Sequence, residues 1–146
     1  MEKYNILLIE DDIRTGEIVK SALELGGDMR VDWAKDGDEA LATMEAGKYD
    51  LIISDIKMPN KTGDMVIAEI RKIDEFVSVL VYTNYHDEPE IMRNLLNLQI
   101  DGYYQKGGKS DIWELVAKAK NILEPFSKEK REQFLNQLPK DIFKEA

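Results

Sequence analysis

Short apolar runs alternate with helical apolar stripes along the first 123 residues, and this alternation limits the fold more than any other feature. The runs cover residues 4–9, 29–34, 50–54, 76–82 and 101–105 and are rich in β-branched and aromatic side chains, as strands are. The stripes between them repeat at three- or four-residue spacing, as on one face of a helix. Five βα units follow. Their strands run parallel, because crossover helices connect them, and helices then cover both faces of the sheet.

The predicted helices are marked by boundary residues and by apolar positions. Gly26 and Gly27 follow the first stripe, Gly47 follows the second, and Pro89 stands where the fourth helix begins. We expect the apolar positions to face the sheet. They are Ile18, Ala22 and Leu25; Ala40, Leu41 and Met44; Val66, Ile67 and Ile70; Ile91, Leu95 and Leu98; and Ile112, Leu115, Val116, Ala119, Ile122 and Leu123.

The composition indicates one domain and excludes several kinds of function. A chain of 146 residues with 43% hydrophobic residues can build one sizeable core. It contains no cysteine, which removes disulfides and thiolate chemistry. The net charge of -9 disfavours direct nucleic-acid binding, because an acidic surface repels phosphate backbones. No apolar run is long enough for a signal peptide or a membrane span, so we expect a cytoplasmic protein.

Chemically active side chains are concentrated at the predicted strand ends. Glu10 and Asp11 follow the first strand, Asp55 follows the third, Thr83 follows the fourth and Lys106 follows the fifth. In an open parallel sheet, working groups gather outside the carboxyl ends of the strands. We therefore expect three carboxylates, a hydroxyl and an ammonium in one small patch.

Such a patch suits a hard cation and a phosphoryl group. Crowded carboxylates repel one another unless they hold protons or a cation neutralises them, and oxygen-only ligands select Mg²⁺. Asp55 is the candidate nucleophile toward phosphorus, with positive charge from Lys106 and a hydroxyl hydrogen bond from Thr83. Each residue alone also has a structural explanation. Asp12, which follows the acid pair, is the best candidate for an N-cap of the first helix.

Four motifs carry these residues: ILLIEDD, DLIISDIKMPNKTG, VLVYTN and DGYYQKG. Together they resemble bacterial response-regulator receiver domains of the chemotaxis-regulator type, across residues 3–123. The resemblance implies a flavodoxin-like, doubly wound sheet of five parallel strands in the order 2-1-3-4-5. It also implies a response regulatory domain over 1–123, which leaves 124–146 as a short helical extension without an output domain.

The resemblance assigns a role to each residue of the patch. Asp55 becomes the phosphoryl acceptor and a ligand of Mg²⁺. Asp11 becomes a direct ligand of the metal, Glu10 acts on it through water, and Lys57 offers its backbone carbonyl. Lys106 matches the lysine that grips the phosphoryl group.

Switch residues and two departures follow from the same resemblance. Thr83 matches the switch hydroxyl and Tyr103 the switch aromatic, while Gly63 matches a glycine of the loop after the acceptor. The residue after the switch threonine is usually small, whereas this chain has Asn84, whose amide is expected to modulate access to the acyl phosphate. A glycine, Gly107, replaces the proline that commonly follows the lysine, and a cis bond there would be costly.

The expected function is a phosphorelay signalling switch. The receiver takes a phosphoryl group from a histidine kinase or histidine phosphotransferase and changes the face made by the fourth helix, fifth strand and fifth helix. That face would bind a downstream protein or a second copy of the chain, with no direct nucleic acid and no membrane partner. The only reaction expected is self-phosphorylation followed by slow hydrolysis, so the chain is not predicted to be an enzyme.

Two other functions stay open on the sequence, and a third, a flavodoxin-like carrier, is excluded. A magnesium-dependent phosphohydrolase would use the same aspartyl-phosphate chemistry, but the first strand lacks the DxD pattern of enzymes resembling the haloacid dehalogenases. A flavodoxin-like electron carrier needs a phosphate-cradling loop after the first strand, where this chain has acids. A degenerate, phosphate-independent receiver is suggested only by Asn84 and Gly107.

The extension 124–146 carries five acidic and five basic residues, so the excess negative charge lies before it. A helix is expected over residues 127–138, with Phe134 and Leu135 among its apolar side chains. This helix either packs over nearby apolar surface or continues toward a further domain. A sharper hypothesis is that its apolar edge covers part of the signalling face near Trp113.

Overall fold

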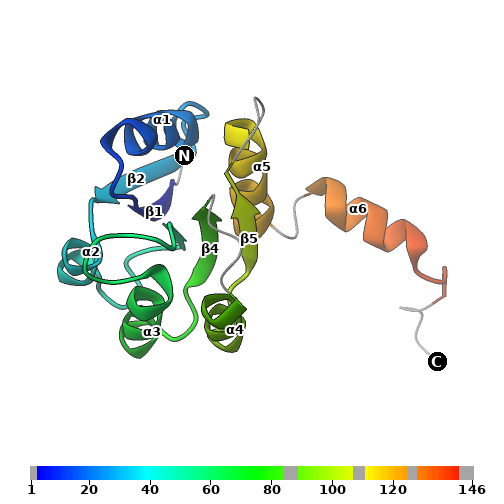
Figure 1. The fold of residues 1–146 in the computed structure, drawn as a ribbon. Helices are drawn as coiled ribbons and strands as arrows, with labels where there is room; N and C mark the ends of the chain where they lie inside the picture. The colour runs from blue at the N-terminus through cyan, green and yellow to red at the C-terminus, as the bar shows by residue number, and fades with distance from the viewer. Residues whose placement is uncertain (1–2, 84–88, 107–110, 125–127, 142–146) are drawn as a thin grey trace.

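The computed structural model describes residues 3–83, 89–106, 111–124 and 128–141, which contain one five-stranded sheet with helices on both faces (Figure 1). The strands are β1 (Tyr4–Ile9), β2 (Met29–Ala34), β3 (Leu51–Ser54), β4 (Ser78–Thr83) and β5 (Gly102–Gln105). All neighbours are parallel, in the order β2-β1-β3-β4-β5. The doubly wound, flavodoxin-like α/β fold expected from the sequence is therefore confirmed.

Strand register places the expected site residues side by side. Ile9 at the end of β1 pairs with Ser54 at the end of β3, so the next residues, Glu10 and Asp55, leave the sheet together. Thr83 at the end of β4 pairs with Gln105 at the end of β5. The carboxyl edge of the sheet thus gathers residues that are far apart in the sequence.

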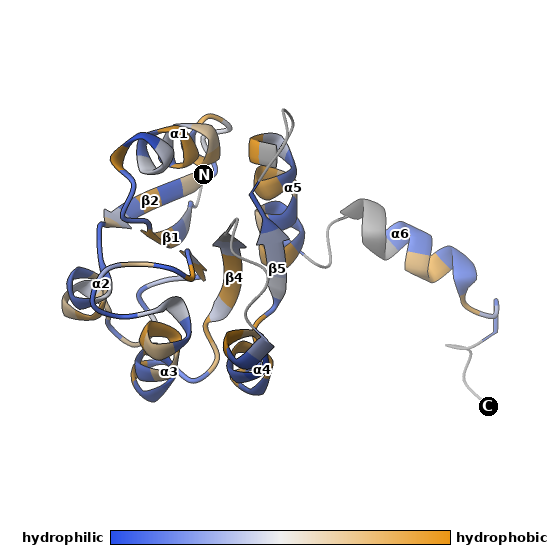
Figure 2. Cartoon of the chain, in the orientation of Figure 1, coloured by the Kyte–Doolittle hydropathy of each residue, from blue (hydrophilic) through white to orange (hydrophobic). Residues whose placement is uncertain are grey.

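The helices form a layer on each side of the sheet. They are α1 (Ile13–Glu24), α2 (Gly37–Thr43), α3 (Gly63–Ile73), α4 (Pro89–Asn97), α5 (Asp111–Leu123) and α6 (Lys128–Gln137). Helices α1 and α5 cover one face, and α2, α3 and α4 cover the other (Figure 1). Helices α3 and α4 are hydrophobic toward the sheet and hydrophilic on their outer sides (Figure 2). None of the described helices is long and apolar enough to cross a lipid bilayer.

The core consists of two apolar clusters separated by the sheet. Successive residues of β1 alternate between them, with Ile6 and Leu8 on the α1 and α5 side and Leu7 and Ile9 on the other. All four side chains are fully buried, as expected for a central strand of a parallel sheet. Each contributes roughly 1.5–3 kcal/mol through burial, so β1 is a firm base for the acidic residues that follow it.

The apolar stripe expected in the first helix is wrong. Ile18 and Leu25 are 53% and 74% exposed, and the side of α1 that faces the sheet carries Gly16, Val19 and Leu23 instead. Both sets have helical spacing, but the set on the sheet side includes a glycine and so looks less apolar in the sequence.

Helix α6 agrees with the expected helix over 127–138 to within a residue at each end. Its described side chains from Glu132 to Gln137 are exposed, including Phe134 and Leu135. The helix lies apart from the sheet and from the other helices (Figure 1). The hypothesis that this helix covers the surface near Trp113 is therefore contradicted in this structure, where Trp113 is itself 55% exposed.

Candidate functional site

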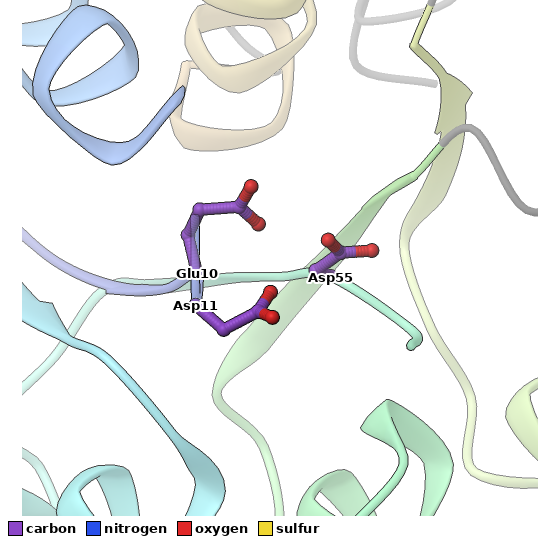
Figure 3. A group of neighbouring side chains, drawn as sticks. All are labelled: Glu10, Asp11 and Asp55. Carbon is purple, nitrogen blue, oxygen red and sulfur yellow. The ribbon is translucent and has the colours of Figure 1, made fainter. Parts of the chain in front are cut away.

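Three carboxylates meet at the carboxyl edge of the sheet. Glu10 and Asp11 follow β1 and Asp55 follows β3, and their side chains converge on one space (Figure 3). One oxygen from each lies within 4.8 Å of the others. Glu10 and Asp55 are buried, whereas Asp11 is exposed. The cluster therefore opens to solvent on the side of Asp11.

Backbone hydrogen bonds and a close helix fix Asp55. Its amide donates to the Ile9 carbonyl over 3.0 Å, which ties the residue to β1, and the Ile56 amide donates to Asp55 Oδ1 over 2.7 Å. Gly63, at the start of α3, donates its amide to the Ile56 carbonyl over 2.6 Å. A Cβ at Gly63 would overlap the Asp55 carbonyl oxygen and lie 2.9 Å from Ile56 Cα. Only glycine fits this approach of α3 to the strand end.

Lys106 links the acids from the end of β5. Its Nζ lies 2.8 Å from Glu10 Oε1 and 3.0 Å from Asp55 Oδ2, and the side chain is largely buried. These are charge-assisted hydrogen bonds within a partly buried site, where Coulomb interactions are stronger than in water. One ammonium facing three carboxylates leaves the cluster with surplus negative charge.

Glu10 is an acid that is only partly compensated, because Lys106 contacts one of its two carboxylate oxygens. Burial raises its pKa to about 8, hydrogen bonding to Asp55 adds to the rise, and Lys106 opposes it. Among the described residues, the buried Oε2 of Glu10 has no hydrogen-bond partner. For Lys106, burial lowers the pKa, but the hydrogen bond to Glu10 and the charge of Asp55 raise it above its usual value overall.

The residues of the cluster fit a hard divalent cation. An unpartnered buried carboxylate oxygen, an open side at Asp11 and surplus negative charge are what such an ion requires. The ligand set contains only oxygen, which suits Mg²⁺. Expected ligands Glu10, Asp11 and Asp55 are thus brought together by the fold.

Asp12 serves another purpose. Its Oδ2 accepts a hydrogen bond from the Thr15 amide over 3.0 Å and so caps the first turn of α1. Hydrogen bonding from the Thr15 hydroxyl and amide lowers its pKa. The N-cap prediction is confirmed, and Asp12 does not belong to the acid cluster.

Several expected site residues are placed only in part. Thr83 ends β4, but its side chain lies outside the described part of the structure. Asn84 and Gly107 lie outside the described residues altogether. Lys57 is exposed in the loop after β3, and the role of its carbonyl stays a prediction. Tyr103 lies in β5 and packs, partly buried, against the cluster on the α4 side.

One residue beside the site was not expected from the sequence. Trp33, in β2, donates its indole N–H to the Glu10 carbonyl over 2.9 Å and so holds the backbone that carries the acid pair. The ring fits beneath α1 because residue 16 is glycine, and a Cβ there would overlap the ring. Glycine is unfavourable inside a helix, so a glycine at position 16 of the predicted helix could have indicated that another group packs closely there.

Comparison with known families places these features in context. The sequence profile described as response regulator receiver domain matches residues 6–120. The chain is 32% identical over 124 residues to the uncharacterized transcriptional regulatory protein YbdJ of Bacillus subtilis, covering 85% of this chain and 52% of that protein. It is 34% identical over 118 residues to the transcriptional activator protein IrlR of Burkholderia pseudomallei, covering 81% and 49%. The chain spans about half the length of these relatives.

Solved structures agree with the profile. The non-phosphorylated HemR receiver domain from Leptospira biflexa has a TM-score of 0.75 at 27% identity, covering 83% of this chain and 94% of that one. A CheY-like response regulator receiver domain protein from Methanospirillum hungatei has a TM-score of 0.77 at 26% identity, covering 90% and 99%. The chain therefore belongs to the response regulator receiver domain family, whose members are signalling modules of two-component systems.

Proposed function

We propose that this receiver domain is a switch controlled by phosphorylation of Asp55. The observation that carries the proposal is the position of the Asp55 carboxylate, buried beside the acid pair and 3.0 Å from the Lys106 ammonium. Receiver domains interact with histidine kinases and with downstream effectors. The donor is accordingly a phosphohistidine of a kinase or phosphotransferase.

The transfer needs little covalent chemistry from the protein. An Asp55 oxygen attacks phosphorus, a new P–O bond forms, the P–N bond of the donor breaks, and the histidine nitrogen keeps the electron pair. The Lys106 ammonium would contact the transferred phosphoryl group, because it lies within hydrogen-bond distance of the Asp55 carboxylate that receives this group. Its charge would then stabilise the phosphoryl oxygens, while Glu10 keeps the ammonium oriented.

Mg²⁺ is the cofactor that we propose for this site. Glu10, Asp11, Asp55 and the carbonyl of Lys57 would hold it, with Glu10 acting through water. When bound, the ion supplies positive charge that offsets the carboxylates and the incoming phosphoryl group. Surplus negative charge and the unpartnered Oε2 of Glu10 support this assignment.

The output is proposed to pass through α4, β5 and α5. Thr83 would donate its hydroxyl to the phosphoryl group, and Tyr103 would change its packing in response. Tyr103 is suited to this, since it packs partly buried against the cluster that includes Leu95 of α4. Asn84 would modulate access to the acyl phosphate. The partner is a downstream protein or a second copy of the chain.

The regulation of transcription is a property of the curated relatives, of which this chain spans about half. An acidic domain with a net charge of -9 is poorly suited to holding DNA itself. We therefore propose that the described domain acts through protein contacts.

Intact-mass measurement tests the proposal. After incubation with acetyl phosphate and Mg²⁺, the parent should gain one phosphoryl group, and omission of Mg²⁺ should prevent the gain. Asp55→Asn should gain none under the same conditions. Incorporation by the Asp55→Asn variant at the parent's level would show that another residue is the acceptor.

A further inference from the structure

Beneath the site, an aromatic ring touches the lysine. The Lys106 ammonium lies over the ring of Tyr82, 5.1 Å from its centroid. Tyr82 belongs to β4, is 5% exposed, and lies on the α1 and α5 side of the sheet. An ammonium over an aromatic face is attracted by the negative charge of the face, and more so when water is excluded.

The Tyr82 ring is itself held in place. Tyr82 pairs with Tyr104 of β5, and their rings stack with centroids 5.8 Å apart and planes 26° apart. The Tyr104 hydroxyl donates to Glu114 of α5. The ring below the ammonium is therefore part of a packed layer that reaches α5, and it cannot turn freely.

A hollow beside the Tyr82 ring leaves room into which the Lys106 side chain could move if the ring were absent. About 210 Å³ of space lies between α1, α5 and the sheet, lined by Tyr82 and Lys106. Thr15 and the apolar side chains of Ile18, Val19 and Ile112 complete the wall. Lysine has a long, flexible side chain. A smaller residue than tyrosine at position 82 would enlarge the hollow and give the side chain of Lys106 more positions away from the acids.

Described side chains contact the Lys106 ammonium and set its position. These are Glu10 at 2.8 Å, Asp55 at 3.0 Å and the ring of Tyr82.

We propose that Tyr82 is a positioning residue for Lys106, holding the ammonium against the Asp55 carboxylate so that it meets the incoming phosphoryl group. The inference rests on the proposed function of Asp55 and Lys106. The hydroxyl of Tyr82 is not required, because the ring face is what the ammonium touches.

Rates of phosphoryl incorporation test this role. Tyr82→Leu should react roughly three- to thirtyfold more slowly than the parent at saturating Mg²⁺, the range expected for loss of a cation–ring contact. Tyr82→Phe keeps the ring and should restore the rate to within about twofold. Tyr49→Leu is the matched control. Tyr49 is also 5% exposed, but it contacts Asp32 and lies in the other core cluster, so this variant reports the cost of losing a buried tyrosine alone.

A double-mutant cycle isolates the pair. With Lys106→Met in place, adding Tyr82→Leu should cause no further loss of rate. The proposal is overturned if Tyr82→Leu reacts like the parent, if Tyr49→Leu slows the reaction equally, or if the loss persists in full in the Lys106→Met background.

A second measurement does not depend on phosphorylation. In proton NMR spectra, the Lys106 methylene protons next to Nζ should be shifted upfield by the Tyr82 ring in the parent and in Tyr82→Phe, and not in Tyr82→Leu. The Lys106→Met variant assigns the signals by their loss. If no variant accepts phosphate while this shift is present, the proposed function fails and the contact stands. If the parent shows no shift, the positioning role is wrong whatever the phosphorylation result.

Discussion

Glu10 is buried, and among the described residues one of its two carboxylate oxygens has no hydrogen-bond partner, so its ionisation is coupled to folding. In the unfolded chain it titrates near 4.5, and in the folded, metal-free domain burial raises its pKa to about 8. A group whose pKa rises on folding adds stability below its unfolded pKa, and this stability is lost as pH rises toward the folded pKa. The metal-free domain should therefore be destabilised by Glu10 between about pH 4.5 and pH 8.

The Glu10→Gln variant isolates this effect, because glutamine has the shape of the protonated acid and cannot ionise. Relative to this variant, the parent should lose about 1–3 kcal/mol of unfolding free energy between pH 5 and pH 8. Urea unfolding of both proteins with EDTA present at the two pH values measures the difference. Parallel pH profiles for parent and variant would argue against a raised pKa at Glu10.

Asp11 and Asp12 are neighbours with different tasks, which makes them a matched pair. Asp11→Ala removes a proposed ligand and also relieves repulsion, so Mg²⁺ affinity should nearly disappear while metal-free stability holds or rises. Asp12→Ala should cost about 1 kcal/mol through loss of the cap and leave Mg²⁺ affinity almost unchanged. Titration with Mg²⁺, followed by Trp33 fluorescence in a Trp113→Phe background, measures affinity. Equal loss of affinity in both variants would contradict these assignments.

The acid cluster and Lys106 could be predicted because parallel strands end at a common edge, so residues after different strands meet regardless of their separation in sequence. The role of Trp33 could not be predicted, since its indole donates to the backbone carbonyl of Glu10. Every residue has such a carbonyl, so the sequence does not mark which one the indole contacts. Tyr82 was hidden for a similar reason. A tyrosine in a buried strand is ordinary, and only the structure shows which side chain lies over its ring.

At the level of elements, α3 approaches the end of β3 only because Gly63 has no side chain. Gly63→Ala should lower the free energy of unfolding by about 1–3 kcal/mol, since the added carbon meets backbone atoms that cannot turn aside. It should also weaken Mg²⁺ binding, because the carbonyl and side chain of Asp55 would be displaced together. Gly26→Ala is the control, as its added carbon meets only the ends of the flexible Asp28 and Lys120 side chains, at 3.2 and 3.7 Å. Gly63→Ala with the stability of the parent would show that α3 moves at little cost.

Element positions were predicted better than element edges. The strands expected to begin at residues 50 and 101 begin one residue later. The amides of Asp50 and Asp101 still donate to the Asn5 and Val79 carbonyls, but their carboxylates, and not backbone carbonyls, accept from the amides of those two residues. Asp50 accepts from the Asn5 amide over 2.8 Å, and Asp101 accepts from the Val79 amide over 2.7 Å. Aspartate competes for backbone hydrogen bonds in this way, and a pattern of apolar residues does not reveal it.

At the scale of the whole molecule, the described side chains of α6, from Glu132 to Gln137, are exposed and lie away from the sheet. Since exposed side chains contribute little burial energy, we predict that deletion of residues 125–146 shifts Tm by less than about 2 °C. Thermal unfolding of both chains followed by circular dichroism checks this. A much larger drop in Tm, or a change in Trp113 fluorescence on deletion, would show that the segment packs against the domain in solution.

The proposed switch depends on which carboxylate accepts the phosphoryl group. Reduction of the phosphorylated protein with borohydride converts an aspartyl phosphate to homoserine, and peptide mass analysis then locates the modified residue. We predict homoserine at position 55 alone, formed only when phosphodonor and Mg²⁺ are both present and in proportion to the phosphorylated fraction. Modification at Glu10, Asp11 or Asp12 with an intact Asp55 would contradict the account.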